Sequence, residues 1–139
     1  MMTSRTPTLT ALALGLVGAV FGLATAHAAS PSAAAQLKSW DTDQDGTIDL
    51  PEAKKAAEAK FDRLDTDHDG TLDMTELAST GIHKMTFAKA DPDKDGTLDK
   101  SEYLNLVEAR FNAADSDHDG TISKAELRTP FGRALARLL

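Results

Sequence analysis

The stretch Asp65-Thr66-Asp67-His68-Asp69-Gly70-Thr71-Leu72-Asp73-Met74-Thr75-Glu76 decides the fold of this chain. Side chains with oxygen ligands stand at positions 1, 3, 5, 9 and 12, with glycine at position 6 and an aliphatic residue at position 8. A hard cation takes roughly six to eight oxygen ligands, which a sharply turning loop supplies from alternate side chains and from the position-7 carbonyl. The stretch therefore predicts a cation site, with the glutamate binding through both oxygens.

The pattern occurs four times, at residues 41–52, 65–76, 91–102 and 115–126, called here loops one to four. Ordinary Asp/Gly turns would not place glutamate at position 12 each time, and the pattern is that of the EF-hand loop. The predicted metal ligands are Asp41, Asp43, Asp45, Thr47, Asp49, Glu52, Asp65, Asp67, Asp69, Thr71, Asp73, Glu76, Asp91, Asp93, Asp95, Thr97, Asp99, Glu102, Asp115, Asp117, Asp119, Thr121, Ser123 and Glu126.

The acidic residues of the chain are concentrated in the four loops, which indicates a set of cation sites. The net charge is −7, and every acidic residue lies in one of the four loops except Glu58, Asp62 and Glu108. No basic patch exists to meet phosphate, which argues against nucleic acid as a partner. The sequence has no cysteine, no phosphate loop and no nucleophile with a positioned base, so we expect no enzyme activity. His68 and His118 stand at position 4, where we expect solvated side chains rather than a transition-metal site.

The N-terminus has the pattern of a secretory signal. Arg5 precedes an apolar run over 9–24, and Ala26-His27-Ala28 provides a small-residue cleavage site. The run is short for the alternative, a membrane anchor. We therefore expect a cleaved signal over 1–28, a flexible segment over 29–36 and a metal-binding domain over 37–139. The predicted location is the periplasm or the exterior of a bacterium, without membrane attachment after cleavage.

Apolar residues repeat around the loops and should form the core. The position four residues before each loop and the position directly after it are apolar throughout. These positions are Leu37, Phe61, Phe87 and Phe111 before the loops, and Ala53, Leu77, Tyr103 and Leu127 after them.

The segments between the loops predict how the loops pair. Residues 53–64 have room for one unbroken helix, so loops one and two lie at its opposite ends. Gly81 can end a helix within 77–90, which folds the chain back and brings Leu72 beside Leu98. A second unbroken helix over 103–114 returns loop four to loop one, so that Ile48 can pair with Ile122.

The predicted fold class is all-α, a small helical bundle with four EF-hand loops joined by unusually short helices. Loops two and three pair, and so do loops one and four. At the end of the chain, Thr129 can cap a final helix with Pro130 in its first turn. Leu135, Leu138 and Leu139 give that helix an apolar stripe.

The short loop spacing, DPDKDGTLDKSEY around loop three, EARFNAADSDHDGTI at loop four and the ending TPFGRALARLL resemble lanmodulin over essentially all of residues 37–139. Lanmodulins are periplasmic lanthanide-binding EF-hand proteins of methylotrophic bacteria. The resemblance implies lanthanide binding and a fold that compacts on metal binding. Lanmodulin resembles a four-fold copy with proline at position 2. Here only Pro92 fits, with Thr42, Thr66 and Ser116 in the other loops.

Two classes of ion and two further roles stay open at the level of sequence. Up to four Ca²⁺ or lanthanide(III) ions are the expected cofactors. A lanthanide uptake or storage protein is the first hypothesis, and the threonine and serine residues at position 2 favour the alternative, a calcium buffer or sensor. The third hypothesis is a metal-dependent interaction module, whose apolar faces would form a homodimer or dock on a periplasmic partner.

Overall fold

The computed structural model describes residues 32–139, so the predicted signal over 1–28 lies outside the described residues. The elements are helices α1 (Ala33–Trp40), α2 (Leu50–Leu64), α3 (Lys84–Ala90), α4 (Lys100–Ala114) and α5 (Pro130–Ala136), the 3-10 helices η1 (Glu76–Thr80) and η2 (Glu126–Arg128), and the two-residue strands β1 (Thr71–Leu72) and β2 (Leu98–Asp99). This composition confirms the all-α class. None of the described helices is long and apolar enough to cross a membrane.

Helices α2 and α4 are the two unbroken helices that the sequence predicts between loops. Each begins with a capping box in which the position-9 aspartate and the position-12 glutamate of the preceding loop exchange hydrogen bonds. Pro51 lies in the first turn of α2, where its missing N–H leaves no hydrogen bond unmade. The loops therefore set where both long helices begin.

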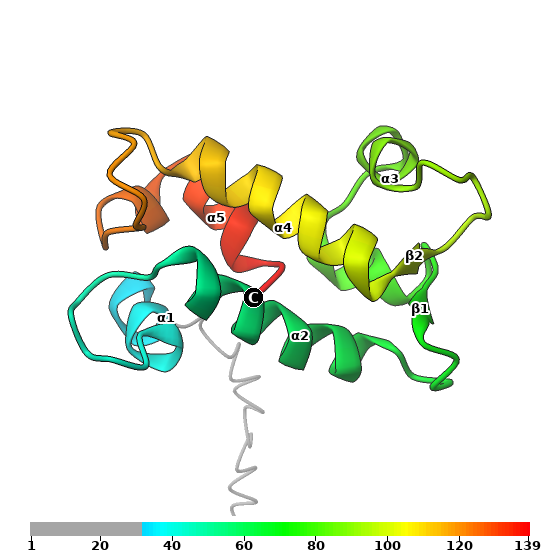
Figure 1. Ribbon diagram of the computed structural model, residues 1–139, viewed down its shortest axis with the longest axis horizontal. Coiled ribbons are helices and arrows are strands. Elements are labelled where there is room, and N and C mark those ends of the chain that lie inside the picture. The colour runs from blue at the N-terminus through cyan, green and yellow to red at the C-terminus, as the bar shows by residue number, and fades with distance from the viewer. Residues whose placement is uncertain (1–31) are drawn as a thin grey trace, which may run out of the picture.

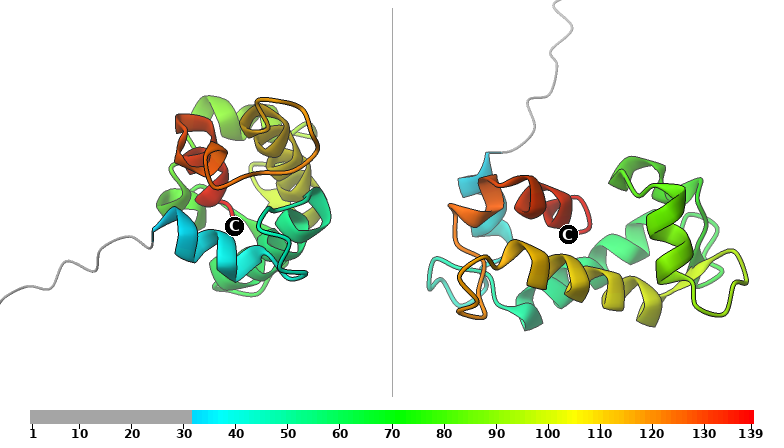
Figure 2. Two further views of the ribbon diagram at one scale, coloured as in Figure 1. Left: turned by 90° about the vertical axis from the view of Figure 1, so that its left-hand side faces the viewer. Right: turned by 90° about the horizontal axis from the view of Figure 1, so that it is seen from above.

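The long helices α2 and α4 run side by side through the middle of the molecule, and α5 packs on α4 (Figures 1 and 2). The ring centroids of Phe61 on α2 and Tyr103 on α4 lie 5.7 Å apart in an edge-to-face arrangement. Lys54 Nζ lies 2.7 Å from Glu108 Oε2, and Lys100 Nζ lies 2.8 Å from Asp62 Oδ1. Apolar contacts and two ion pairs thus join the same two helices.

The four loops lie in two groups at opposite ends of this helix pair (Figure 1). Strands β1 and β2 are antiparallel, with Leu72 opposite Leu98. At the other end, Ile48 N donates to Ile122 O at 3.1 Å and Ile122 N donates to Ile48 O at 2.8 Å. Loop two thus lies against loop three, and loop one against loop four, as the helix lengths predict.

The core contains the apolar positions that repeat around the loops. All four residues at the position before each loop and all four directly after it are buried, as are the aliphatic residues at position 8. Leu135 and Leu138 of the C-terminal segment are also fully enclosed, and Tyr103 Oη donates to Leu138 O at 2.8 Å. Phe131 is an exception among the aromatic residues, because 58% of it stays exposed.

Helix α1 begins at Ala33, inside the segment that the sequence predicts to be flexible. Residues 33–36, predicted to be part of a flexible segment, form the first turn of α1, with Ser32 at the N-cap. Ser32 Oγ accepts a hydrogen bond from Ala35 N at 3.3 Å, and the alanines that follow are strong helix formers.

The segment between loops two and three also has its predicted break. Gly81 adopts a left-handed conformation with φ of 71° and separates η1 from α3. The first of these helices is a 3-10 helix rather than an α-helix. At the end of the chain, Thr129 caps α5 as predicted, with Oγ1 accepting from Gly132 N at 3.0 Å.

Candidate metal centres

Each loop begins where a helix ends. The position-1 aspartate is the C-cap of the preceding helix in every case, and its N–H donates to the carbonyl of the apolar residue four positions earlier. Position 4 has a positive φ of 59–63° and the glycine at position 6 has a φ of 87–91° in all four loops. Such values at position 6 are accessible mainly to glycine. The backbone therefore makes the same sharp turn four times.

Hydrogen bonds from the backbone and from threonine hold the carboxylates in place. The glycine N–H of each loop donates to Oδ2 of the position-1 aspartate at 3.0–3.2 Å. The position-7 threonine donates both its N–H and its hydroxyl to Oδ1 of the position-5 aspartate. Because the threonine hydroxyl is engaged in this hydrogen bond, only the backbone carbonyl of the threonine is available as a metal ligand.

The structure gathers three carboxylates of each loop around a common centre. The ligand atoms of each group lie within 4.8 Å of one another. The groups are Asp41, Asp43 and Asp45; Asp65, Asp67 and Glu76; Asp91, Asp93 and Glu102; and Asp115, Asp117 and Glu126. Three of the four groups combine positions 1, 3 and 12, whereas loop one combines positions 1, 3 and 5.

The position-9 side chains accept a hydrogen bond from the backbone of the position-12 glutamate. Asp49, Asp73 and Asp99 accept the N–H of the position-12 glutamate through Oδ1 at 2.8–2.9 Å, and Ser123 Oγ does so at 3.3 Å. Asp49 and Asp99 are the N-caps of α2 and α4, whereas Asp73 and Ser123 lie three residues before η1 and η2. All four lie outside the gathered groups. Position 9 often serves calcium through a water molecule, a role that leaves the side chain available for capping.

The position-12 glutamates differ in how they are held, and position 2 decides the difference. Thr66 donates its N–H and its hydroxyl to Glu76 Oε1 at 2.8 and 3.1 Å. Thr42 binds Glu52 and Ser116 binds Glu126 in the same way. Pro92 has neither donor, so Glu102 accepts only the Asp99 N–H, through Oε2 at 2.9 Å. The sequence shows the single proline at position 2, but the loss of both donors to Glu102 is evident only in the structure.

The pKa values of the glutamates follow these hydrogen bonds. Desolvation raises the pKa of Glu126, but donors from Ser123 and Ser116 outweigh it and bring the pKa to about 2. The pKa of Glu52 is also lowered, since the donors from Thr42, Asp49 and Asp43 outweigh desolvation. For Glu102, desolvation and the neighbouring carboxylates outweigh its one donor, so its pKa is raised. Hydrogen bonds therefore compensate the negative charge of Glu102 less than that of Glu52 or Glu126.

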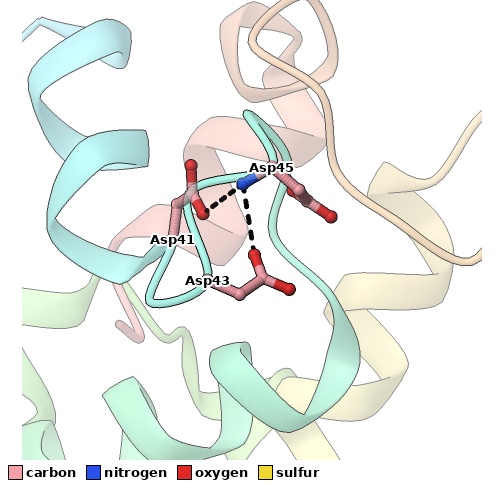
Figure 3. A group of neighbouring side chains, drawn as sticks. All are labelled: Asp41, Asp43 and Asp45. Atoms are coloured by element: carbon pink, nitrogen blue, oxygen red, sulfur yellow. Dashed lines mark hydrogen bonds between the residues drawn. The ribbon is translucent and has the colours of Figure 1, made fainter.

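In loop one, hydrogen bonds and neighbouring carboxylates likewise have opposite effects on the pKa values of exposed aspartates. The Asp45 N–H donates to both Asp41 Oδ1 and Asp43 Oδ1, at 3.1 and 3.2 Å (Figure 3). This N–H lowers the pKa of Asp43, but desolvation and the nearby carboxylates raise it by more in sum. The two donors of Thr47 lower the pKa of Asp45. A cation would relieve the mutual repulsion of these groups.

The histidines at position 4 take no part in the gathered groups. His68 and His118 are exposed and adopt the positive φ of their loop position. The carboxylate clusters therefore consist of hard oxygen donors alone, the donor type that Ca²⁺ and similar ions prefer.

A family model described as EF hand matches residues 59–79, 82–107 and 106–131, just over half of the chain. The chain belongs to the EF-hand family. The matches include loops two, three and four of this EF-hand protein, and loop one lies before them. No curated protein is significantly similar to the chain. A solved structure of a homolog of programmed cell death 6 protein from Leishmania major Friedlin is 18% identical, over 78% of this chain and 96% of that one, with a TM-score of 0.32.

The family and the acidic groups together indicate a calcium-binding protein. EF-hand loops bind Ca²⁺ through carboxylate and carbonyl oxygens, and the gathered groups supply such oxygens in all four loops. The coordination by all 24 named residues stays a prediction, because three carboxylates per loop form the gathered groups.

Proposed function

We propose that this EF-hand chain is exported to the periplasm and binds hard, oxygen-seeking cations in four loops, in the service of lanthanide uptake or storage. The observation that carries the proposal is the fourfold clustering of carboxylates at the turns. In this proposal residues 1–28 are a signal that is removed on export, and residues 37–139, extended by the first turn of α1, form the metal-binding domain.

Charge supports a trivalent ion. Loop one has five carboxylates, at Asp41, Asp43, Asp45, Asp49 and Glu52, and loops two and three have the same number at the same positions. Coulomb energy scales with ion charge, so a lanthanide gains about half as much again as Ca²⁺ of similar radius before desolvation is counted. A loop with this density of negative charge favours the higher charge. The resemblance to lanmodulins points in the same direction.

Metal binding and folding should be coupled. The gathered carboxylates repel one another, and this repulsion adds to desolvation in raising the pKa values of Asp43 and Glu102. The core is thin in large side chains, since α2 contributes Ala53, Ala57 and Phe61 as its buried apolar residues. An ion that neutralises the loops contributes its binding free energy to folding. We therefore expect metal to compact the chain.

A calcium buffer or sensor is the second candidate, and position 2 favours it. Three loops have threonine or serine where the lanmodulin pattern has proline, and these residues bind the position-12 glutamate.

A metal-dependent homodimer is a further proposal, supported by the exposed hydrophobic residues Met85 and Phe131. Size-exclusion chromatography with and without calcium tests it, and an unchanged monomer in calcium rejects it.

Trp40 provides the reporter for the main test. It is the only tryptophan, it adjoins Asp41, and it lines a cavity together with Thr42 and Glu52. Its fluorescence and the far-UV circular dichroism would be followed in chelator-buffered Ca²⁺ and, separately, in chelator-buffered La³⁺. The control is the variant with Glu52, Glu76, Glu102 and Glu126 all changed to Gln, which should lose both responses.

The midpoints separate the candidates. A La³⁺ midpoint many decades below the Ca²⁺ midpoint supports the lanthanide role. A complete response at micromolar to millimolar Ca²⁺, with La³⁺ only modestly tighter, supports the calcium buffer or sensor. No response to either ion rejects metal binding. Export is tested separately, by the mass of the protein recovered from the periplasm, which should fit a chain beginning near Ala29.

A further inference from the structure

The position-1 aspartates divide the loops into two classes. Asp65 Oδ1 and Asp91 Oδ1 are buried and accept no hydrogen bond within the described chain. These residues are only 8% and 6% exposed, and each belongs to the gathered carboxylate group of its loop. An unpaired carboxylate oxygen away from water is costly, and the centre of its group is where a cation would pair with it.

Loops one and four satisfy the same oxygen without an ion. Asp41 Oδ1 accepts the Asp45 N–H at 3.1 Å, and Asp115 Oδ1 accepts the Asp119 N–H at 3.2 Å. Figure 3 shows the Asp45 nitrogen in this bridging place, where it also faces Asp43. In all four loops the position-5 N–H donates to the position-3 aspartate, and in loops two and three this is its one acceptor among the described residues. A cation entering loops one and four therefore competes with an existing donor.

The residue at position 2 distinguishes loop two from loop three, the two loops whose position-1 aspartate has an unpaired oxygen. In loop two, Thr66 donates twice to Glu76 Oε1. In loop three, Pro92 leaves Glu102 with a single donor, which binds Oε2. Loop three thus has two ligand oxygens, Asp91 Oδ1 and Glu102 Oε1, without a hydrogen-bond donor among the described residues.

We propose that the metal sites load in a fixed order, in which loops two and three take up ions before loops one and four, and loop three does so before loop two. The inference rests on the proposed metal-binding function. Loops two and three each have an unpaired aspartate oxygen that an ion can bind directly. In loops one and four, an ion must first replace the backbone N–H that donates to the same oxygen. Each pair is joined through its position-8 residues, so the midpoints of the two loops within a pair should differ less than the midpoints of the two pairs.

The chain contains one reporter for each site. The N–H groups of Gly46, Gly70, Gly96 and Gly120 each donate to the position-1 aspartate of their own loop. An ion that polarises this carboxylate will move the corresponding amide signal. A titration of the ¹⁵N-labelled protein with Ca²⁺, followed by ¹H–¹⁵N correlation spectra, therefore reads all four loops separately in one experiment.

We expect the Gly70 and Gly96 signals to change first, at a midpoint about tenfold below that of Gly46 and Gly120. Simultaneous change of all four signals, or earlier change of Gly46 and Gly120, overturns the order while leaving metal binding intact. No change in any of the four signals overturns the proposed function itself. The two failures are therefore distinguishable.

Matched variants test the cause. The double variant Glu52→Gln, Glu126→Gln should leave the first transition at Gly70 and Gly96 unchanged, whereas Glu76→Gln, Glu102→Gln should abolish it or shift it at least tenfold.

The reciprocal pair Pro92→Thr and Thr66→Pro tests the order between loops two and three. Pro92→Thr should raise the Gly96 midpoint to that of Gly70, and Thr66→Pro should lower the Gly70 midpoint. Unmoved midpoints in both variants would reject the role assigned to position 2.

Discussion

Ile48 and Ile122 exchange two backbone hydrogen bonds, at 3.1 and 2.8 Å, although they belong to the first and last loops of the chain. Both side chains are fully buried. The bonds fix the two loops back to back, so a displacement of one loop backbone reaches the other directly. This contact is the physical basis for expecting the loops to act in pairs.

Truncation of Ile122 should weaken both loops of its pair. Ile122→Ala removes buried methyl groups and leaves a cavity, which should lower the free energy of unfolding by about 2–5 kcal/mol. Urea unfolding in saturating calcium measures this loss. The calcium midpoint should rise at Gly46 as well as at Gly120. Met85→Ala is the control, because Met85 is 77% exposed and its loss should change stability by less than about 0.5 kcal/mol. A rise at Gly120 alone would contradict the coupling.

The close approach of α5 to η2 depends on Gly132. A Cβ atom at this position would lie 2.0 Å from Glu126 O and 2.6 Å from Leu127 Cα, both of them backbone atoms that cannot easily move. We expect Gly132→Ala to displace α5 and to destabilise the protein by about 1–3 kcal/mol, measured by thermal unfolding in calcium. Arg133→Ala, on the exposed part of the same helix, should have little effect. Equal stability of both variants would mean that α5 does not dock as described.

Tyr103 should ionise only when the protein unfolds. Burial raises its pKa, and its hydroxyl donates to Leu138 O at 2.8 Å. Because the folded pKa is above the unfolded value of about 10, this group's contribution to stability is fully present below that value and is lost as the pH rises above it. Near-UV absorbance follows this single tyrosine. Tyrosinate should appear together with the loss of helical circular dichroism.

The variant Tyr103→Phe provides the comparison for the alkaline titration. It removes the ionisable group and the hydrogen bond to Leu138 while keeping the ring that packs against Phe61. Its stability should be lower near neutral pH, by about 1 kcal/mol, and should depend less on pH in the alkaline range. Tyrosine ionisation near its ordinary pKa in the folded protein would contradict the buried position.

The ion pair between Lys100 and Asp62 should contribute little. Its nitrogen and oxygen lie 2.8 Å apart, but the two side chains are 48% and 64% exposed. The Asp62 hydrogen bond raises the pKa of Lys100, yet exposed pairs are screened by water and salt. We expect Lys100→Gln to lower the free energy of unfolding by less than about 1 kcal/mol, and the loss to shrink at high salt. A larger loss would point to the Lys100 contact with the Phe61 ring, at 5.2 Å.

Much of this molecule follows from local sequence. The loop pattern predicts the turns, because position 6 needs glycine for its φ and position 1 needs a short oxygen acceptor at a helix end. The repeat also predicts which apolar residues are buried, since each loop presents the same neighbours to the core. Helix length alone predicts that loops one and two cannot meet. The unbroken α2, from Leu50 to Leu64, keeps them at its two ends.

Other features depend on which segments meet in space. The near-identical loops differ in how their position-1 aspartates are satisfied. Asp65 and Asp91 have an unpaired buried oxygen, whereas the same oxygen of Asp41 and of the equally buried Asp115 accepts a backbone N–H. The backbone contact at Gly132 and the hydrogen bond from Tyr103 to Leu138 likewise join segments that local sequence does not connect. The twelve-residue motif determined which atoms could bind an ion. Only the tertiary structure decided which of those atoms were buried without a hydrogen-bond donor, because desolvation depends on the neighbours that packing brings.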